Sequence, residues 1–303
     1  MIIFILSDNF DYGDYMPDDA GPRFAEMYGW KSVRLSQCSF VDENIFVVDC
    51  YLDGHECEML RQVIARNPTI KFFFHTVDPW PHIRGTAVFN FLIRNHEYLN
   101  VFISSPYLPT ESTALLFSKM GDRFVFTPYL YDRRKEMPLS DNVRKKVIII
   151  SGNIGLPDYP VRNSINKSRI FNPLFWCKIK RLPHSGYNFS KPNHAMVGDA
   201  YIKELSRYRY AAVCSSRLRL EFLKYREIAY AGCVPIGDLP GTLSDCPSEG
   251  IIQWRRNVFV THGELSNPNW VCKAMIYRDY ISSARDMAIW QARVRDKMRR
   301  KII

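Results

Sequence analysis

The sequence predicts an α/β protein made of two Rossmann-like, doubly wound domains that face each other across a cleft. In the first half, short apolar runs alternate with amphipathic stretches, and the second half repeats this alternation. A polar, proline-containing segment without apolar periodicity, residues 129–145, separates the halves. Because strands that alternate with helices imply right-handed crossovers, each half should form a parallel sheet. We therefore predict an N-terminal domain of residues 1–135 and a C-terminal domain of residues 136–303 that ends in a helix.

The expected elements follow from the pattern of each half. Runs of four to nine mostly apolar residues bounded by polar or turn residues indicate buried strands, and longer amphipathic stretches indicate helices. In the first half these rules predict strands at 2–6, 44–52, 71–75, 100–105 and 123–128, and helices at 55–67 and 85–99. In the second half they predict strands at 146–152, 175–182, 210–216, 233–238 and 257–261, and one long helix over the last residues.

Composition indicates a soluble protein. Hydrophobic residues make up 47% of the 303 residues and charged residues 24%, which is the balance of a globular chain. No apolar run approaches the roughly 20 residues that cross a bilayer, and the opening "MIIFIL" is short and lacks the basic flank of a signal peptide. The eight cysteines form no C-x-x-C pair, so we expect reduced thiols. We expect a cytoplasmic protein, in the host cytoplasm if the chain is viral.

The formal net charge of +10 favours a polyanionic partner. Nucleic acid, an acidic membrane surface and a phosphate-bearing small molecule all fit that sign. No nucleic-acid-binding module is recognisable, so we expect no nucleic acid partner. The basic C-terminal residues 293–301 suit a solvated helix end, where the helix dipole favours cations, and contact with an acidic membrane is the alternative.

Residues 215–241, "SSRLRLEFLKYREIAYAGCVPIGDLPG", form the most informative segment. Apolar residues at helical spacing give an inward stripe of Leu218, Phe222, Tyr225 and Ala229. Gly232 stands where a left-handed residue would close the helix, and "CVPI" begins the next strand. Glu227, an acidic residue of this helix, lies off the stripe and faces the strand ends.

This segment resembles the donor-binding segment of GT-B glycosyltransferases, and most closely that of exostosin-type enzymes. The resemblance implies that Glu227 accepts hydrogen bonds from the ribose of a nucleotide sugar. It implies an enzyme that transfers a sugar from a nucleoside diphosphate donor, with a UDP-sugar favoured, to a carbohydrate acceptor. The chain is also similar to small soluble glycosyltransferases of large algal viruses, some of which resemble xylosyltransferases, so we expect UDP-xylose as the donor.

The diphosphate of such a donor needs cations. Arg217, Arg219 and Lys224 cluster at the predicted start of the same helix, where backbone N–H groups and the dipole favour an anion. The glycine-containing loop after the first strand of the second half supplies further candidates. They are Gly152, Asn153, Arg162 and Lys167, and the resemblance singles out Arg162 as the main phosphate contact.

The resemblance also bears on mechanism. Many retaining GT-B enzymes have an acid eight positions before the ribose glutamate, and here that position is Arg219, so we expect inversion. A single displacement needs a base, and loops after strands of the first half offer Asp14, Asp78 and His75. Trp80 beside them suits a sugar face of the acceptor.

No metal and no cofactor are expected, because the aspartates of residues 8–19 lack the order of an EF-hand loop and GT-B enzymes usually need no metal. Two alternatives stay open at this point. One is a basic nucleic-acid-binding protein, and the other is a non-catalytic protein that binds nucleotides as a scaffold.

Overall fold

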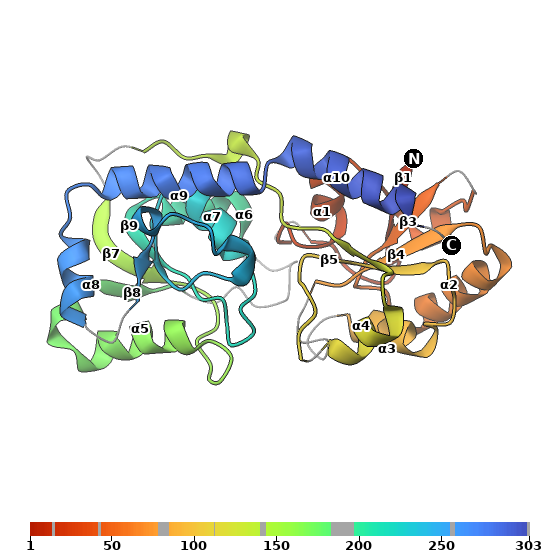
Figure 1. The fold of residues 1–303 in the computed structure, drawn as a ribbon, viewed down its shortest axis with the longest axis horizontal. Helices are drawn as coiled ribbons and strands as arrows, with labels where there is room; N and C mark the ends of the chain where they lie inside the picture. Colours follow the sequence, from red (N-terminus) through yellow and green to blue (C-terminus); the bar gives the residue numbers. More distant parts are fainter. Residues whose placement is uncertain are drawn as a thin grey trace. The chain divides into compact units, whose positions relative to one another are not determined.

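The computed structural model describes residues 1–13, 16–41, 44–77, 85–111, 113–139, 144–182, 197–254 and 258–301, without the side chains of 258–260. The chain divides into two compact units (Figure 1). Unit 1 comprises Met1–Leu130 and Met287–Ile303, and unit 2 comprises Tyr131–Asp286. This division lies close to the predicted boundary, but it assigns the closing helix to unit 1 rather than to the C-terminal domain.

Unit 1 contains a parallel six-stranded sheet in the order β2-β1-β3-β4-β5-β6. Its strands are β1 (Ile2–Leu6), β2 (Lys31–Arg34), β3 (Ile45–Val48), β4 (Lys71–His75), β5 (Val101–Ser105) and β6 (Phe124–Phe126). Its helices are α1 (Gly21–Met27), η1 (Leu35–Gln37), α2 (Gly54–Arg66), α3 (Thr86–Arg94), α4 (Ala114–Met120) and α10 (Met287–Arg300).

Both faces of this sheet are buried, which explains why its inner strands are continuous apolar runs. Along β1, Ile3 and Ile5 join the core under α2, α3 and α4, while Phe4 joins the opposite core. Val294 and Met298 of α10 complete that second core. The apolar stripe of α10 thus explains why this helix belongs to unit 1.

Unit 2 contains a parallel five-stranded sheet in the order β11-β10-β9-β7-β8. Its strands are β7 (Lys145–Ile150), β8 (Ile179–Arg181), β9 (Tyr208–Ala212), β10 (Val234–Gly237) and β11 (Ile252–Gln253). Its helices are η2 (Arg133–Lys135), α5 (Pro160–Phe171), η3 (Pro173–Phe175), α6 (Gly198–Leu205), α7 (Leu223–Ala231), η5 (Gly241–Leu243), η6 (Ser248–Gly250), α8 (Val258–Leu265) and α9 (Trp270–Ala284).

The fold class is confirmed, and nine of the ten predicted strand regions contain a strand. The exception is 257–261, where the prediction of a strand is wrong because α8 begins at Val258. The short β11, a few residues earlier, already occupies the place beside β10, so the apolar run "VFV" continues as a helix. The polar edge strand β2 was not predicted, because "KSVR" lacks an apolar run.

The predicted closing helix is two helices. α9 ends at Ala284, and Arg285 turns its side chain toward the buried Glu221. The backbone N–H of Tyr131 donates to the Arg285 carbonyl at 2.8 Å, and Tyr131 pairs with Asp286 in a parallel bridge. The helix break therefore coincides with the point where the chain leaves unit 2.

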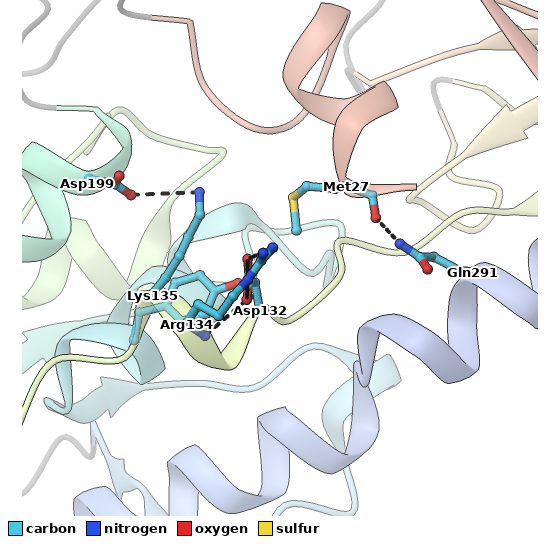
Figure 2. Close-up of polar contacts among 7 residues, drawn as sticks. Met27, Asp132, Arg134, Lys135, Asp199 and Gln291 are labelled. Carbon is cyan, nitrogen blue, oxygen red and sulfur yellow. Dashed lines mark hydrogen bonds and ion pairs between the residues drawn. The ribbon is translucent and has the colours of Figure 1, made fainter. Parts of the chain in front are cut away.

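Polar contacts fix the first residues of unit 2 and the helix α10 of unit 1 (Figure 2). In unit 2, the Arg134 guanidinium donates to both carboxylate oxygens of Asp132, and Lys135 pairs with Asp199 at 3.7 Å. In unit 1, the Gln291 side chain donates to the carbonyl of Met27 at 2.6 Å and so ties α10 to α1. The basic end of α10 is exposed as expected, and its contact with a membrane stays a prediction.

Candidate functional site

The candidate site lies in unit 2, where β7 ends and Arg162 folds back over the following loop. Arg162 is the third residue of α5 and is 3% exposed. Its Nη1 donates to the carbonyls of Ser151 at 3.2 Å and Asn153 at 2.8 Å, and its guanidinium lies 4.2 Å from the ring centre of Tyr159. Within the described residues its buried Nε has no hydrogen-bond partner. A buried cation thus lies at a helix N-terminus, and both the cation and the helix N-terminus attract anions.

Gly152 allows this arrangement. Its φ of +80° lies in the left-handed region that side chains rarely adopt. A Cβ built there would lie 2.6 Å from Nη1 of Arg162 and 2.8 Å from Cε of Lys224. The glycine therefore lets two cationic side chains approach the turn after β7 from α5 and α7.

Lys224 and Glu227 lie one turn apart on α7, and both are half-buried. The Lys224 Nζ lies 3.4 Å from the hydroxyl of Tyr201, whose ring centre is 4.6 Å away. Burial lowers the pKa of Lys224 to about 8, with a smaller contribution from Arg162, while Glu227 acts in the opposite direction. Burial also raises the pKa of Tyr201, and Glu227 adds to that rise. The carboxylate of Glu227 is therefore close to both groups.

Tyr201, on α6, contacts both α7 and the loop after β7. Its hydroxyl also forms a hydrogen bond with the Ser151 Oγ. Four of the predicted donor residues, Gly152, Arg162, Lys224 and Glu227, thus lie together around a tyrosine that the sequence analysis did not select. No local pattern marks Tyr201, because it comes from α6, a helix with no role in the resemblance.

The position of α7 is fixed by its C-terminus. Gly232 adopts the expected left-handed conformation with φ of +67°. Nη1 of the buried Arg144 donates to the carbonyls of Ala231 and Gly232, both at 2.8 Å, and Nε of Arg278 donates to Ala229 at 3.1 Å. Cations at the negative end of a helix are favoured by its dipole. These contacts hold the helix that presents Lys224 and Glu227.

Two other predicted cations, Arg217 and Arg219, lie outside α7. The helix begins at Leu223, so Arg217, Arg219 and the stripe residue Leu218 precede it in a turn, which corrects the prediction that they lie on it. Arg217 is exposed and pairs with Asp158 at 3.0 Å, and Arg219 is exposed with φ of +54°. Ser216 also has a positive φ, so the backbone turns sharply before α7.

Two further predicted residues of unit 2 are exposed. Lys167 lies on the outer part of α5, and Asn153 uses its side-chain oxygen to accept a hydrogen bond from the Gly155 N–H at 2.8 Å. A second pair of polar residues follows β9 and β10. The backbone N–H of Ser215 donates to Asp238 at 3.1 Å, and the Ser215 hydroxyl donates to the same carboxylate. This pair connects the turn before α7 to the end of β10.

In unit 1, Asp14, Asp78 and Trp80 lie outside the described residues. His75 is the last residue of β4 and is fully buried. Its ring stacks on Phe24 with centroids 4.0 Å apart, and its nitrogens lie 3.4 Å from the Ser104 hydroxyl and 3.2 Å from the Asp19 carbonyl. This position favours a packing role for the imidazole over contact with a substrate.

A carboxylate that the sequence analysis missed follows β3. Asp49 is fully buried, and burial raises its pKa to about 6. It accepts hydrogen bonds from the Tyr12 hydroxyl and the Cys50 N–H, both at 2.8 Å. Nearby, Glu56 accepts from Ser7 Oγ at 2.7 Å and from the Asp8 N–H at 2.5 Å. These two acids anchor the loop after β1 to β3 and α2.

Among the described residues, no three His, Cys, Asp or Glu side chains are grouped as a metal site would require. In the same part of the chain, every helix is too short or too polar to traverse a bilayer.

The chain matches no protein-family model and no curated protein sequence. Solved structures do match it. HepE from Anabaena in complex with UDP aligns with a TM-score of 0.58 and 9% identity over 98% of this chain and 99% of that one. HepE with UDP and glucose aligns with a TM-score of 0.57 and 10% identity over 99% of each chain.

The N-terminal domain of trehalose-6-phosphate phosphatase from Candida albicans gives a TM-score of 0.54 at 10% identity, covering 100% of this chain and 97% of that one. At such identities the likeness establishes the fold alone, which is the GT-B fold of two Rossmann-like domains. It confirms the predicted fold class and leaves the similarity to exostosin-type and algal viral enzymes as a prediction.

Proposed function

We propose that this protein is a glycosyltransferase that moves a sugar from a nucleoside diphosphate donor to a carbohydrate acceptor. The observation that carries the proposal is the cluster of Arg162, Lys224 and Glu227 around the Gly152 turn, at the carboxyl end of β7. Ligands of doubly wound sheets bind at this edge. The HepE structures, which have the same fold, were solved with UDP, UDP-glucose and glucose, which supports a UDP-sugar as the donor.

Each group of the cluster has a role in this proposal. The guanidinium of Arg162 and the ammonium of Lys224 bind the diphosphate and stabilise the charge that develops on it as the sugar departs. The carboxylate of Glu227 accepts hydrogen bonds from the ribose hydroxyls, and charge-assisted bonds of this kind are stronger than neutral ones. UDP-xylose remains our suggestion for the donor itself.

We propose an inverting single displacement. An acid eight positions before Glu227 is replaced by Arg219, and the nearby acid Glu221 is engaged by Arg285 in a buried ion pair. The acceptor hydroxyl must lose its proton to a base as it attacks, and Asp14 and Asp78 are our candidates for that base. His75 is a weaker candidate for the base, because its side chain is fully buried.

The test of this function is calorimetric titration with UDP. We expect the wild-type protein to bind UDP without added metal and Glu227→Ala to bind it roughly 10- to 100-fold more weakly, because about 1.5 to 3 kcal/mol of charge-assisted bonding is lost. Glu249→Ala, an exposed glutamate of the same unit, is the control and should bind normally. If UDP, GDP and ADP all fail to bind, the donor site is disproved. Binding without any sugar transfer or donor hydrolysis would indicate the scaffold alternative.

The lowered pKa of Lys224 predicts a pH dependence. Below about 8 the side chain is a cation and attracts phosphate, so UDP affinity should be highest there and fall as the pH rises through that value. The decline should reach roughly 10-fold, the effect of one charge-assisted hydrogen bond. Titrations at a series of pH values measure it.

Lys224→Met should bind weakly at every pH and show a flat profile in that range. Lys203→Met, which removes an exposed lysine of α6, should keep the wild-type profile. A Lys224→Met protein that retains the wild-type decline would show that another group titrates.

A further inference from the structure

A surface of unit 2 outside the donor site exposes large apolar side chains. Ile170 and Phe171, at the end of α5, are 52% and 78% exposed, and Leu174 and Trp176, in and after η3, are 37% and 61% exposed. Seven consecutive residues thus hold four of the large exposed apolar side chains of the described chain. We call these four residues the α5–η3 patch. Exposed apolar side chains that gather in this way mark an interaction surface more often than scattered ones do.

The patch is built rigidly. Phe175, between the two exposed residues of the η3 turn, is fully buried in the core beside α5. The Leu174 N–H donates to the Asn172 side chain at 3.1 Å, and the indole Nε1 of Trp176 donates to the Ile170 carbonyl at 3.2 Å. The turn therefore holds the indole beside the end of α5 while most of its surface remains exposed.

Positively charged residues flank the patch along the chain. Residues 159–198 contain seven lysines and arginines and no aspartate or glutamate, so most of the net charge of +10 arises in this stretch. Arg169 immediately precedes the exposed pair, and Lys178 follows Trp176 by two residues; both are partly exposed. Lys167 lies one turn earlier on the same helix and is exposed.

We propose that the α5–η3 patch docks this protein on an acidic phospholipid surface. Aromatic and aliphatic side chains enter the boundary between headgroups and acyl chains, and the flanking cations attract the anionic headgroups. Tryptophan is favoured at that boundary because its ring is apolar and its N–H is polar.

The alternatives fit these residues less well. In a symmetric dimer through the patch, the basic flanks of the two copies would face each other, and like charges repel. Single-stranded nucleic acid would use Phe171 and Trp176 as stacking platforms, but Ile170 and Leu174 offer no ring for a base.

The patch also leaves the donor site accessible. α5 begins beside the carboxyl end of β7, where Arg162 lies, and ends with the patch before β8 starts. The helix of 12 residues spans roughly 18 Å, so the two sites lie at opposite ends of it. Docking through the patch is compatible with donor binding.

Co-sedimentation of the full chain with vesicles tests this proposal. We expect binding to phosphatidylcholine vesicles that contain phosphatidylserine, weak binding to pure phosphatidylcholine, and release by salt. Phe171→Gln, Phe171→Gln/Trp176→Gln and Arg169→Gln/Lys178→Gln should each bind at least ~10-fold more weakly, since each removes one of the two attractions. Leu99→Gln, which removes an apolar side chain of unit 1 that is 64% exposed, should bind normally.

The single variant Phe171→Gln should fold normally, because a side chain that is 78% exposed contributes little to the core. Equal vesicle binding by the wild type and Phe171→Gln would overturn the proposal. So would a patch-dependent dimer in sedimentation velocity, or patch-dependent binding of a single-stranded oligonucleotide without binding to vesicles. Measurements of UDP affinity in the same variants separate this surface from the donor site, whose function the proposal does not require.

Discussion

Arg162→Met should lower the rate of sugar transfer by roughly 100- to 1,000-fold, the usual effect of removing a group that stabilises transition-state charge. The guanidinium is buried at the start of α5, so its charge is poorly screened by water. It also holds the carbonyls of Ser151 and Asn153, and thereby the shape of the Gly152 turn. The substitution removes the cation and this support together. Steady-state kinetics with a UDP-sugar, and UDP affinity measured in parallel, give the result.

Two further variants sharpen the interpretation. Arg162→Lys keeps the charge but lacks the planar fork, so it should recover only part of the rate. Arg169→Met removes a cation from the other end of the same helix and should retain normal transfer. If Arg162→Met unfolds at lower temperature but transfers sugar at the normal rate, then Arg162 supports the turn and has no part in catalysis.

Much of the fold was predictable because buried parallel strands leave a strong local signal. The bounds of the strands at Ile2–Leu6 and Lys71–His75 were predicted to the residue. Both faces of the sheet are covered, so the first run is apolar throughout and the second is apolar at its three central positions. The end of α7 at Gly232 was predictable for a different reason, namely that few residues other than glycine adopt its left-handed conformation.

The errors arise where neighbours decide the structure. The run at Val258 has the composition of a strand, but another segment already pairs with β10, so it forms a helix. β2 pairs with β1 at the sheet edge with the polar residues Lys31 and Ser32 and could not be recognised from apolar content. The first turn of the predicted helix, at Leu218, does not form because Ser216 and Arg219 adopt positive φ values.

The resemblance selected Arg162 and Gly152 for the candidate site, but local geometry alone predicts a contact only between residues that share one element. Lys224 and Glu227 are three positions apart on one helix, so their proximity follows from helical geometry. That Arg162 folds back over the loop before it depends on the tertiary structure, and so does the contact of Tyr201 with Ser151, 50 residues away. His75 was predicted to lie at a strand mouth, but its position within β4 points its ring into the core beside Phe24.

Arg285→Met should destabilise unit 2 by about 3 to 5 kcal/mol, the effect of breaking a buried ion pair and leaving one charge behind. Arg285 and Glu221 are each 7% exposed, and Nε of the arginine donates to the carboxylate at 2.9 Å. A second bond joins the same two groups, and the Thr242 hydroxyl donates to Glu221 at 2.7 Å. Without the guanidinium, the carboxylate would keep only the threonine. Urea unfolding, followed for each unit separately, measures the loss.

The double variant Glu221→Leu/Arg285→Met distinguishes a buried charge from lost packing. Replacing both members removes the uncompensated charge, so it should recover most of the stability and lie within roughly 2 kcal/mol of the wild type. Arg207→Met is the matched control, because Arg207 pairs with Glu204 through an exposed guanidinium. This substitution should lower the free energy of unfolding by less than about 1 kcal/mol. If Arg285→Met and Arg207→Met have equal effects, or the double variant is as unstable as Arg285→Met, the pair does not hold the end of α9. Since Glu221 lies in the turn that leads into α7, loss of the pair should also weaken UDP binding, whereas Arg207→Met should not.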